Sequence, residues 1–186
     1  MKTRIFTTLI LFGLASAFML FQSCDKATEL AKFNVKMTLP KVSVPITQSV
    51  KNSLTDSSYV QFSQYVNVDS IKAAHGLTSL TLENGQVTGA LITITTPAGA
   101  NFAFLNSARL TLFTSAANEL QVAHTGVIDS TATSVQLILD VADITPFLTN
   151  QVFSGRLYYD VNYAAMPAPT VLLGLANTVQ FTVAPF

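Results

Sequence analysis

The sequence predicts an antiparallel β-sandwich of the immunoglobulin-like kind with one short helix. Apolar and polar residues alternate along many short stretches, and this period of two is typical of strands with one buried face. Turn signals separate the stretches about every ten residues. The regular alternation of strands and helices that a parallel sheet requires is missing, so about nine short strands should pack as two antiparallel layers.

The first strands are predicted after residue 32. Phe33, Val35 and Met37 alternate with polar residues until Pro40, which ends the stretch. A second alternation covers 42–46, where Pro45 indicates an edge strand because proline cannot donate to a sheet ladder. Residues 47–66 are polar with scattered aromatics, and the pattern does not assign them.

A helix and a hairpin are predicted next. Over 69–76, Asp69 is a suitable N-cap and Gly76 suits the position that follows a helix. The pair Asn84-Gly85 then lies between two runs rich in Thr and apolar residues, at 78–83 and 86–96. Because Asn-Gly favours a type I′ turn, a β-hairpin is expected there.

The remaining elements follow the same two patterns. A helical turn is expected at 143–148, with Asp143 as its cap and Pro146 in its first turn. Further strands are expected near 108–114, 120–124, 135–141, 156–163, 171–175 and 178–183, with a turn at 116–119. One domain, 33–186, should contain them all.

The composition excludes some classes of protein. Charged residues make up 11% of the chain, and ten basic residues balance ten acidic ones. A protein that binds nucleic acid through phosphate contacts needs a positive face, so no nucleic-acid partner is expected. Hydrophobic residues make up 49% of the chain, which argues against a disordered protein.

The N-terminus carries the sharpest functional signal. Residues 1–4 read MKTR, residues 5–21 carry no charge, and Phe21-Gln22-Ser23-Cys24 follows. A short positive segment before an apolar core is typical of a secretory signal peptide, here 1–23. The FQSC tetrapeptide resembles the lipobox of bacterial lipoproteins processed by signal peptidase II, in a loose form similar to that of Bacteroidota.

The lipobox resemblance implies a lipid anchor. Cys24, the only cysteine of the chain, would carry diacylglyceryl and amide-linked acyl chains such as palmitate, and it would become the first mature residue. Two or more acyl chains hold a protein stably on a leaflet. Residues 24–32 would form a lipidated tether, with the domain on the outer membrane, on either its periplasmic or its surface face.

Other readings of the N-terminus remain open. Ala15-Ser16-Ala17 is an A-x-A site at which signal peptidase I would release a soluble secreted protein. An uncleaved anchor is a further alternative, since seventeen uncharged residues reach the lower end of the spanning range. The remaining alternative is a cytoplasmic protein with an apolar start.

No known catalytic motif appears in the sequence. The chain lacks a G-x-S-x-G elbow, a phosphate-binding loop and clustered metal ligands, so we expect no enzyme, metal or cofactor. His124 is one of only two histidines, and it would need Asp129 or Asp160 beside a serine to form a triad. A strand-end histidine at a turn is the favoured interpretation, and a hydrolase built on His124 is the alternative.

Two sets of residues are candidates for binding or modification. In the alternating stretch 156–163, Arg156, Tyr158 and Asp160 should share the solvent-facing side and could contact a glycan or a protein. Ser70 and Ser130 each follow an aspartate in triplets that resemble the O-glycosylation motif of Bacteroidota. Arg109 lies in a predicted strand, where a solvent-facing or cross-strand ion-pair role is expected.

The functional prediction is therefore a lipid-anchored, non-catalytic protein of the cell envelope with a binding or structural role. Its partners would be the membrane, through the lipid on Cys24, and an envelope protein or glycan. Two alternatives stay open. The high apolar content fits a carrier or chaperone of an apolar ligand, and the many strands fit a surface adhesin subunit that polymerises by strand addition.

Overall fold

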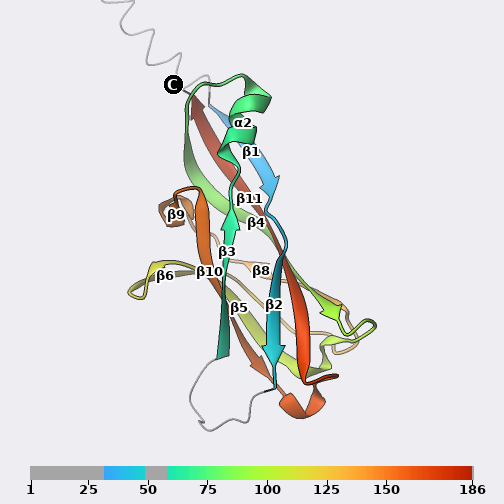
Figure 1. The fold of residues 1–186 in the computed structure, drawn as a ribbon. Coiled ribbons are helices and arrows are strands. Elements are labelled where there is room, and N and C mark those ends of the chain that lie inside the picture. Colours follow the sequence, from blue (N-terminus) through green and yellow to red (C-terminus); the bar gives the residue numbers. More distant parts are fainter. Residues whose placement is uncertain (1–31, 49–57, 186) are drawn as a thin grey trace, which may run out of the picture.

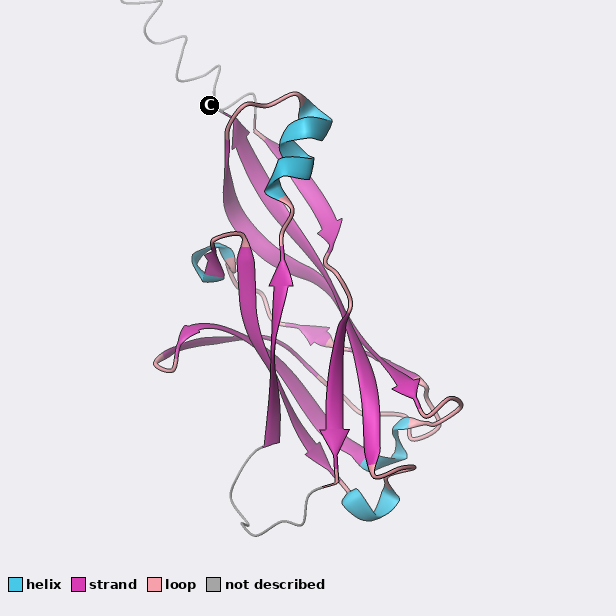
Figure 2. Ribbon diagram, in the orientation of Figure 1, coloured by secondary structure: helices cyan, strands magenta, loops and turns pink. Residues whose placement is uncertain are grey.

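The computed structural model describes residues 32–48 and 58–185. The predicted signal peptide, Cys24 and all of the tether except Lys32 lie outside the described residues. Within the described ranges the chain forms two antiparallel sheets and one α-helix, so the predicted antiparallel sandwich with one short helix is confirmed (Figures 1 and 2). The immunoglobulin-like arrangement in particular stays a prediction.

Sheet A has two long central strands, β4 (Leu80–Thr96) and β11 (Thr170–Pro185). On the other side of β11, β1 (Phe33–Thr38) and β2 (Val42–Thr47) pair in succession with its two halves. The short strand β7 (Ser134–Gln136) pairs with β4. Pro45 lies in β2 at the edge of the sheet, where a missing N–H breaks no ladder.

Sheet B is built around β10 (Val152–Val161) and β5 (Leu105–Ser115). Its order is β3–β10–β5–β6–β8, with β9 paired to β10. The other bounds are β3 Ser58–Tyr65, β6 Asn118–His124, β8 Ile138–Leu139 and β9 Leu148–Thr149. Residues 58–185 also contain three 3₁₀ turns, η1 Phe102–Phe104, η2 Thr145–Phe147 and η3 Tyr163–Ala165.

Buried aromatic and aliphatic side chains join the two sheets. Phe153 of β10 stacks on Phe181 of β11, with ring centres 6.2 Å apart and planes 7° apart. A buried polar link lies beside this core. Asn177 of β11 donates from Nδ2 to Oε1 of Gln64 in β3 at 2.7 Å, and Gln64 donates from Nε2 to the Pro40 carbonyl at 3.0 Å. These bonds connect the β3 edge to the junction of β1 and β2.

The helix α2 spans Val68–His75, close to its predicted range of 69–76. Asp69 is not the N-cap, because Asn67 occupies that position and its side chain accepts a hydrogen bond from the Ser70 N–H at 2.9 Å. Gly76 adopts φ 64° after the last turn, as predicted. At the other predicted helical site, Asp143 accepts from the Thr145 N–H at 2.9 Å, and a 3₁₀ turn forms there.

The hairpin predicted at Asn84-Gly85 is wrong. β4 runs without a turn through both residues, and its register against β11 shifts between Gln180 and Thr182 instead. Asn84 has φ 50°, so the pair forms a bulge in a continuous strand. The runs 171–175 and 178–183, predicted as two strands, likewise form one strand, β11.

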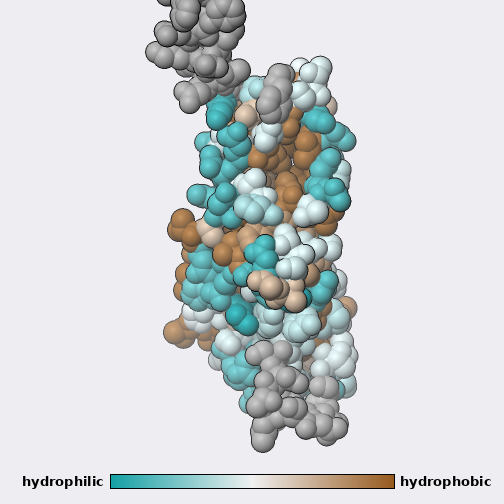
Figure 3. Space-filling view, turned by 90° about the vertical axis from the view of Figure 1, so that its left-hand side faces the viewer, coloured by the Kyte–Doolittle hydropathy of each residue, from teal (hydrophilic) through white to brown (hydrophobic). Residues whose placement is uncertain are grey.

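One end of the molecule carries the helix α2. The helix follows β3 and lies beside β1 (Figure 1), and the Phe33 ring of β1 contacts the His75 ring at a centre distance of 4.4 Å. Figure 3 shows apolar side chains within a hollow near this end, framed by hydrophilic ones. β1 begins at the same end, so the predicted tether 24–32 would join the sandwich there.

Candidate functional site

The outer face of sheet B carries an ordered set of aromatic and charged side chains. Antiparallel pairing places Tyr59, Tyr158, Arg109 and His124 side by side on β3, β10, β5 and β6. A second row lies next to it in the same strand order, with Gln61, Arg156, Thr111 and Gln121. Side chains directly opposite on one face interact, so each row forms a band of contacts across the sheet.

Glu119 of β6 connects members of both rows. Its carboxylate accepts from Nη1 of Arg156 at 2.6 Å, from the Thr111 hydroxyl at 2.5 Å and from the Tyr158 hydroxyl at 3.2 Å. The side chains of Arg156 and Glu119 are 15% and 21% exposed, so water reaches this ion pair only in part. A short, partly shielded, charge-assisted contact of this kind fixes the positions of its partners.

The hydrogen bonds at Glu119 determine its protonation. Burial alone would raise the pKa of this carboxyl, but the hydrogen bonds from Thr111 and Tyr158 and the positive charge of Arg156 outweigh it. The pKa of Glu119 therefore lies below its ordinary value of 4.5. The same neighbours keep Arg156 charged, because Tyr158 and Glu119 raise its pKa although desolvation opposes them.

Both arginines of this face stack on aromatic rings. The guanidinium carbon of Arg156 lies 4.1 Å from the Phe113 ring centre and 5.2 Å from that of Tyr59. The guanidinium carbon of Arg109 lies 4.1 Å from the Tyr158 ring centre. These distances are within the range of cation–π attraction, which restricts where the two positive charges lie.

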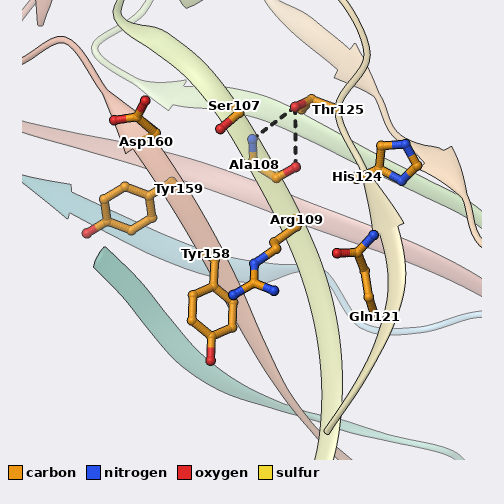
Figure 4. A pocket seen from close by; sticks show the side chains of 9 residues that line it. All are labelled: Ser107, Ala108, Arg109, Gln121, His124, Thr125, Tyr158, Tyr159 and Asp160. Carbon is orange, nitrogen blue, oxygen red and sulfur yellow. Dashed lines mark hydrogen bonds between the residues drawn. The ribbon is translucent and has the colours of Figure 1, made fainter. Parts of the chain in front are cut away.

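A shallow pocket of about 330 Å³ lies beside Arg109 (Figure 4). It is lined by Ser107, Ala108, Arg109, Gln121, His124, Thr125, Tyr158, Tyr159 and Asp160. The lining thus combines a cation, a carboxylate, an amide, hydroxyls and an imidazole. Thr125 connects the end of β6 to β5 at this pocket. Its hydroxyl accepts from the Ala108 N–H at 3.0 Å and donates to the Ala108 carbonyl at 3.3 Å.

His124 has a different partner from those considered in the sequence. Its Nδ1 lies 3.3 Å from Oδ1 of Asp140, so neither Asp129 nor Asp160 is its acid partner. Asp140 also accepts from Nε2 of Gln121 at 3.0 Å. Asp129 instead accepts from the Thr131 N–H and hydroxyl, which lowers its pKa. In the described ranges, no serine hydroxyl hydrogen-bonds to His124.

The predicted surface trio is partly brought together. Arg156 and Tyr158 share the outer face and both contact Glu119, as the alternation suggested. Asp160 is exposed, lines the Arg109 pocket and accepts from Nδ2 of Asn106 at 3.3 Å. Tyr159 points the other way and is half-buried; desolvation raises its pKa, as does the neighbouring Tyr163.

Sequence reasoning missed Glu119 as a site residue. The sequence predicts a turn at 116–119, but Glu119 lies in β6, and only the β5–β6 register brings it to the site. Tyr59 lies in the segment 47–66, to which the sequence pattern assigns no element. Arg109 does face solvent beside a neighbouring strand as expected, although its partner is an aromatic ring rather than an acid.

The two predicted glycosylation residues lie apart from each other. Ser70 is exposed in the first turn of α2, and Ser130 is exposed in the loop after β6. Across 32–48 and 58–185, His, Cys, Asp and Glu form no group of three that could hold a metal ion. No helix within these ranges is long and apolar enough to cross a membrane.

A second hollow, of about 450 Å³, lies between β1 and α2. Its apolar lining comes from Val35, Met37, Leu39, Pro40, Ile71 and Ala74, and its charged or titratable lining from Lys36 and His75. Ser70 lies on its rim. The groove therefore presents a mainly apolar surface to a ligand.

The comparisons with known proteins add no family. No protein-family model matches the chain, and no curated protein matches it. Among solved structures, this chain is similar to a chain in a structure of Turnip Yellow Mosaic Virus at 100 K. The two are 13% identical, the match covers 84% of this chain and 96% of the viral chain, and the TM-score is 0.29. A chain of Desmodium yellow mottle tymovirus is similar at 15% identity, covering 80% and 89%, with a TM-score of 0.27. At these scores neither supports a functional argument.

Proposed function

We propose that the protein is a lipid-anchored, non-catalytic binding module of the cell envelope, and that it binds its partner with the outer face of sheet B. The observation that carries the proposal is the Glu119 network, which fixes aromatic and charged side chains on a solvent-facing sheet. Tyrosine and arginine are the residues most enriched at energetically important positions of interfaces. Holding them in place before binding reduces the entropy that association costs.

The anchor part of the proposal rests on the FQSC lipobox and on the position of β1. Residues 25–32 reach at most about 30 Å when extended, so lipid on Cys24 would keep the sandwich close to the leaflet. Cys24→Ala should move the chain from the membrane fraction to the soluble fraction, and Ser43→Ala is the matched control. A Cys24→Ala chain that stays with the membranes would refute the anchor.

A photo-cross-linking residue in intact cells tests the binding face. Tyr59 is the natural position, because its side chain is half-exposed and contacts the Tyr158 ring at 5.2 Å between centres. Val127 is a control outside both rows, and its side chain is more exposed than that of Tyr59, at 105% against 50%. We expect adducts from position 59 and none of the same mass from position 127. Equal adducts from both, or none from position 59, would count against the face.

A second candidate function, carriage of an apolar ligand such as a lipid, is favoured by the groove between β1 and α2. Its apolar lining and its place at the end where the chain enters β1 would suit a ligand taken from the membrane. Organic extraction of the purified full chain, followed by lipid mass spectrometry, tests it. A non-covalently bound lipid that is lost in Ile71→Asn but kept in Ile138→Asn supports the carrier, and an empty chain refutes it.

A further inference from the structure

We propose that the pocket beside Arg109 binds a saccharide that carries a carboxylate group. The inference rests on the binding role proposed for the outer face of sheet B and names the class of its ligand. Three observations carry it: Arg109 has no ion-pair partner among the described residues, polar side chains surround it, and the pocket lining contains no large aliphatic side chain.

Arg109 offers a guanidinium that has no ion-pair partner among the described residues. By contrast, Arg156, on the same face, is paired with Glu119 at 2.6 Å. Tyr158 stacks on one face of the guanidinium, and Arg109 as a whole is exposed to solvent. The N–H edge of a guanidinium matches the two oxygens of a carboxylate, with which arginine forms paired hydrogen bonds.

The groups around Arg109 suit the hydroxyls of a sugar. Gln121 uses Nε2 to donate to Asp140, so its carbonyl oxygen remains as an acceptor, and Figure 4 shows this oxygen on the side of Arg109. Asp160 accepts one hydrogen bond, from Asn106, and a carboxylate has further acceptor capacity. Ser107 adds a hydroxyl that can both donate and accept. A sugar hydroxyl likewise both donates and accepts.

The lining argues against other carboxylate ligands and against strongly charged ones. It contains no branched aliphatic side chain, and its apolar residues are Ala108, Tyr158 and Tyr159, so an aliphatic side chain of a peptide C-terminus would meet no aliphatic partner larger than Ala108. Asp160 lines the same pocket, and its negative charge opposes a phosphate dianion or a polyanion more strongly than a singly charged carboxylate that pairs with Arg109. A volume of about 330 Å³ is at the lower end of ligand pockets and fits a small saccharide unit.

The test uses two probes that differ at one group, galacturonic acid with its single carboxylate and the uncharged methyl ester of the same sugar. Each is titrated against the detergent-solubilised full chain by isothermal titration calorimetry. We expect the acid to bind about tenfold more tightly or better, as a charge-assisted paired hydrogen bond would provide. Arg109→Gln should bring the affinity for the acid down to that for the ester, and Arg109→Lys should recover part of the difference.

Lys72→Gln, which removes a cation from α2 outside the lining of both pockets, is the matched control and should leave both affinities unchanged. Circular dichroism of each variant establishes that it is folded, and Gln121→Leu, which keeps Arg109, should weaken acid and ester alike. Equal binding of the acid and the ester, an acid affinity that survives Arg109→Gln, or no binding of either probe would overturn the inference. If only the saccharide inference is wrong, the cross-links from position 59 should still form. If those cross-links are also absent, the proposed binding face itself is wrong.

Discussion

The ring of Phe181 lies directly over the backbone of Gly85, so closely that a Cβ at residue 85 would stand 2.5 Å from its Cε1 atom. Phe181 stacks on Phe153 of sheet B, and Gly85 also connects to η2: its N–H donates to the Thr145 hydroxyl at 2.7 Å, and its carbonyl accepts from the Ile144 N–H at 2.8 Å. The bulge in β4 thus helps to seat the aromatic stack that joins the two sheets.

Gly85→Ala should therefore destabilise the fold. The added methyl forces the Phe181 ring or the β4 backbone to move, and overpacking of this kind costs about 1–3 kcal/mol. Gly89→Ala is the control in the same strand, because its Cβ would meet Thr178 at 3.4 Å, an ordinary contact. Urea unfolding of both variants gives the comparison. A Gly85→Ala protein as stable as Gly89→Ala would show that the ring yields at no cost.

The link between Gln64 and Asn177 should stabilise the β3 edge. Both side chains are buried, at 2% and 4% exposed, and Asn177→Ala would leave the Oε1 of Gln64 without its donor. An unsatisfied buried acceptor costs about 1–3 kcal/mol of unfolding free energy. The exposed pair Asn34 and Thr182, joined at 3.0 Å, is the comparison, and Asn34→Ala should change stability by less than about 0.5 kcal/mol.

Replacing both Gln64 and Asn177 separates the contribution of their hydrogen bond from the cost of burying one polar side chain without its partner. Gln64→Leu with Asn177→Leu should cost less than the sum of the two single changes, since the double variant no longer buries one member of this pair without the other. The bond from Gln64 to the Pro40 carbonyl is lost equally in Gln64→Leu and in the double variant, so it does not affect the comparison. Additive losses would mean that the two side chains stabilise the sheets independently.

The lowered pKa of Glu119 predicts a pH dependence of stability. Between the folded pKa and the ordinary value of 4.5, the folded protein binds fewer protons at this carboxyl than the unfolded chain does. The contribution of Glu119 is therefore complete above about pH 4.5 and is lost as the pH falls through the folded pKa. Thermal unfolding from pH 7 to pH 3 should show a flatter decline for Glu119→Gln than for the wild type.

Thr111→Val gives a graded version of the same experiment. It removes one of the hydrogen bonds that lower the pKa of Glu119 and keeps the side chain's shape, so its decline should be intermediate. Identical declines in the wild type and Glu119→Gln would show that other carboxyls govern the acid limb.

Much of the fold follows from local patterns, and its failures have physical causes. Alternation located β1, β2 and β10, because each buries one face. It failed for β3, whose outward side carries Tyr59 and Tyr65, both about half-exposed, so that aromatics lie on both faces of the strand and obscure the period of two.

The Asn84-Gly85 error has a more general cause. A residue with positive φ serves equally in a hairpin turn and in a bulge, and the choice depends on what the next strand offers. Here β11 is sixteen residues long and pairs with β4 on both sides of the bulge, so continuing the ladder satisfies more backbone groups than turning would. The candidate site was predictable only in part for the same reason. Alternation within β10 predicts that Arg156 and Tyr158 share the outer face, but Glu119 and Arg109 come beside them only through the pairing of β10, β5 and β6.

The most direct test of a lipid-anchored sandwich is the mass of its mature N-terminal peptide. Mass spectrometry of the chain purified from its native membranes should give a peptide that begins at Cys24 and carries diacylglyceryl on its thiol. A chain that begins at Met1 or at Phe18, with an unmodified Cys24, would contradict the anchor and would leave a binding module that works without one.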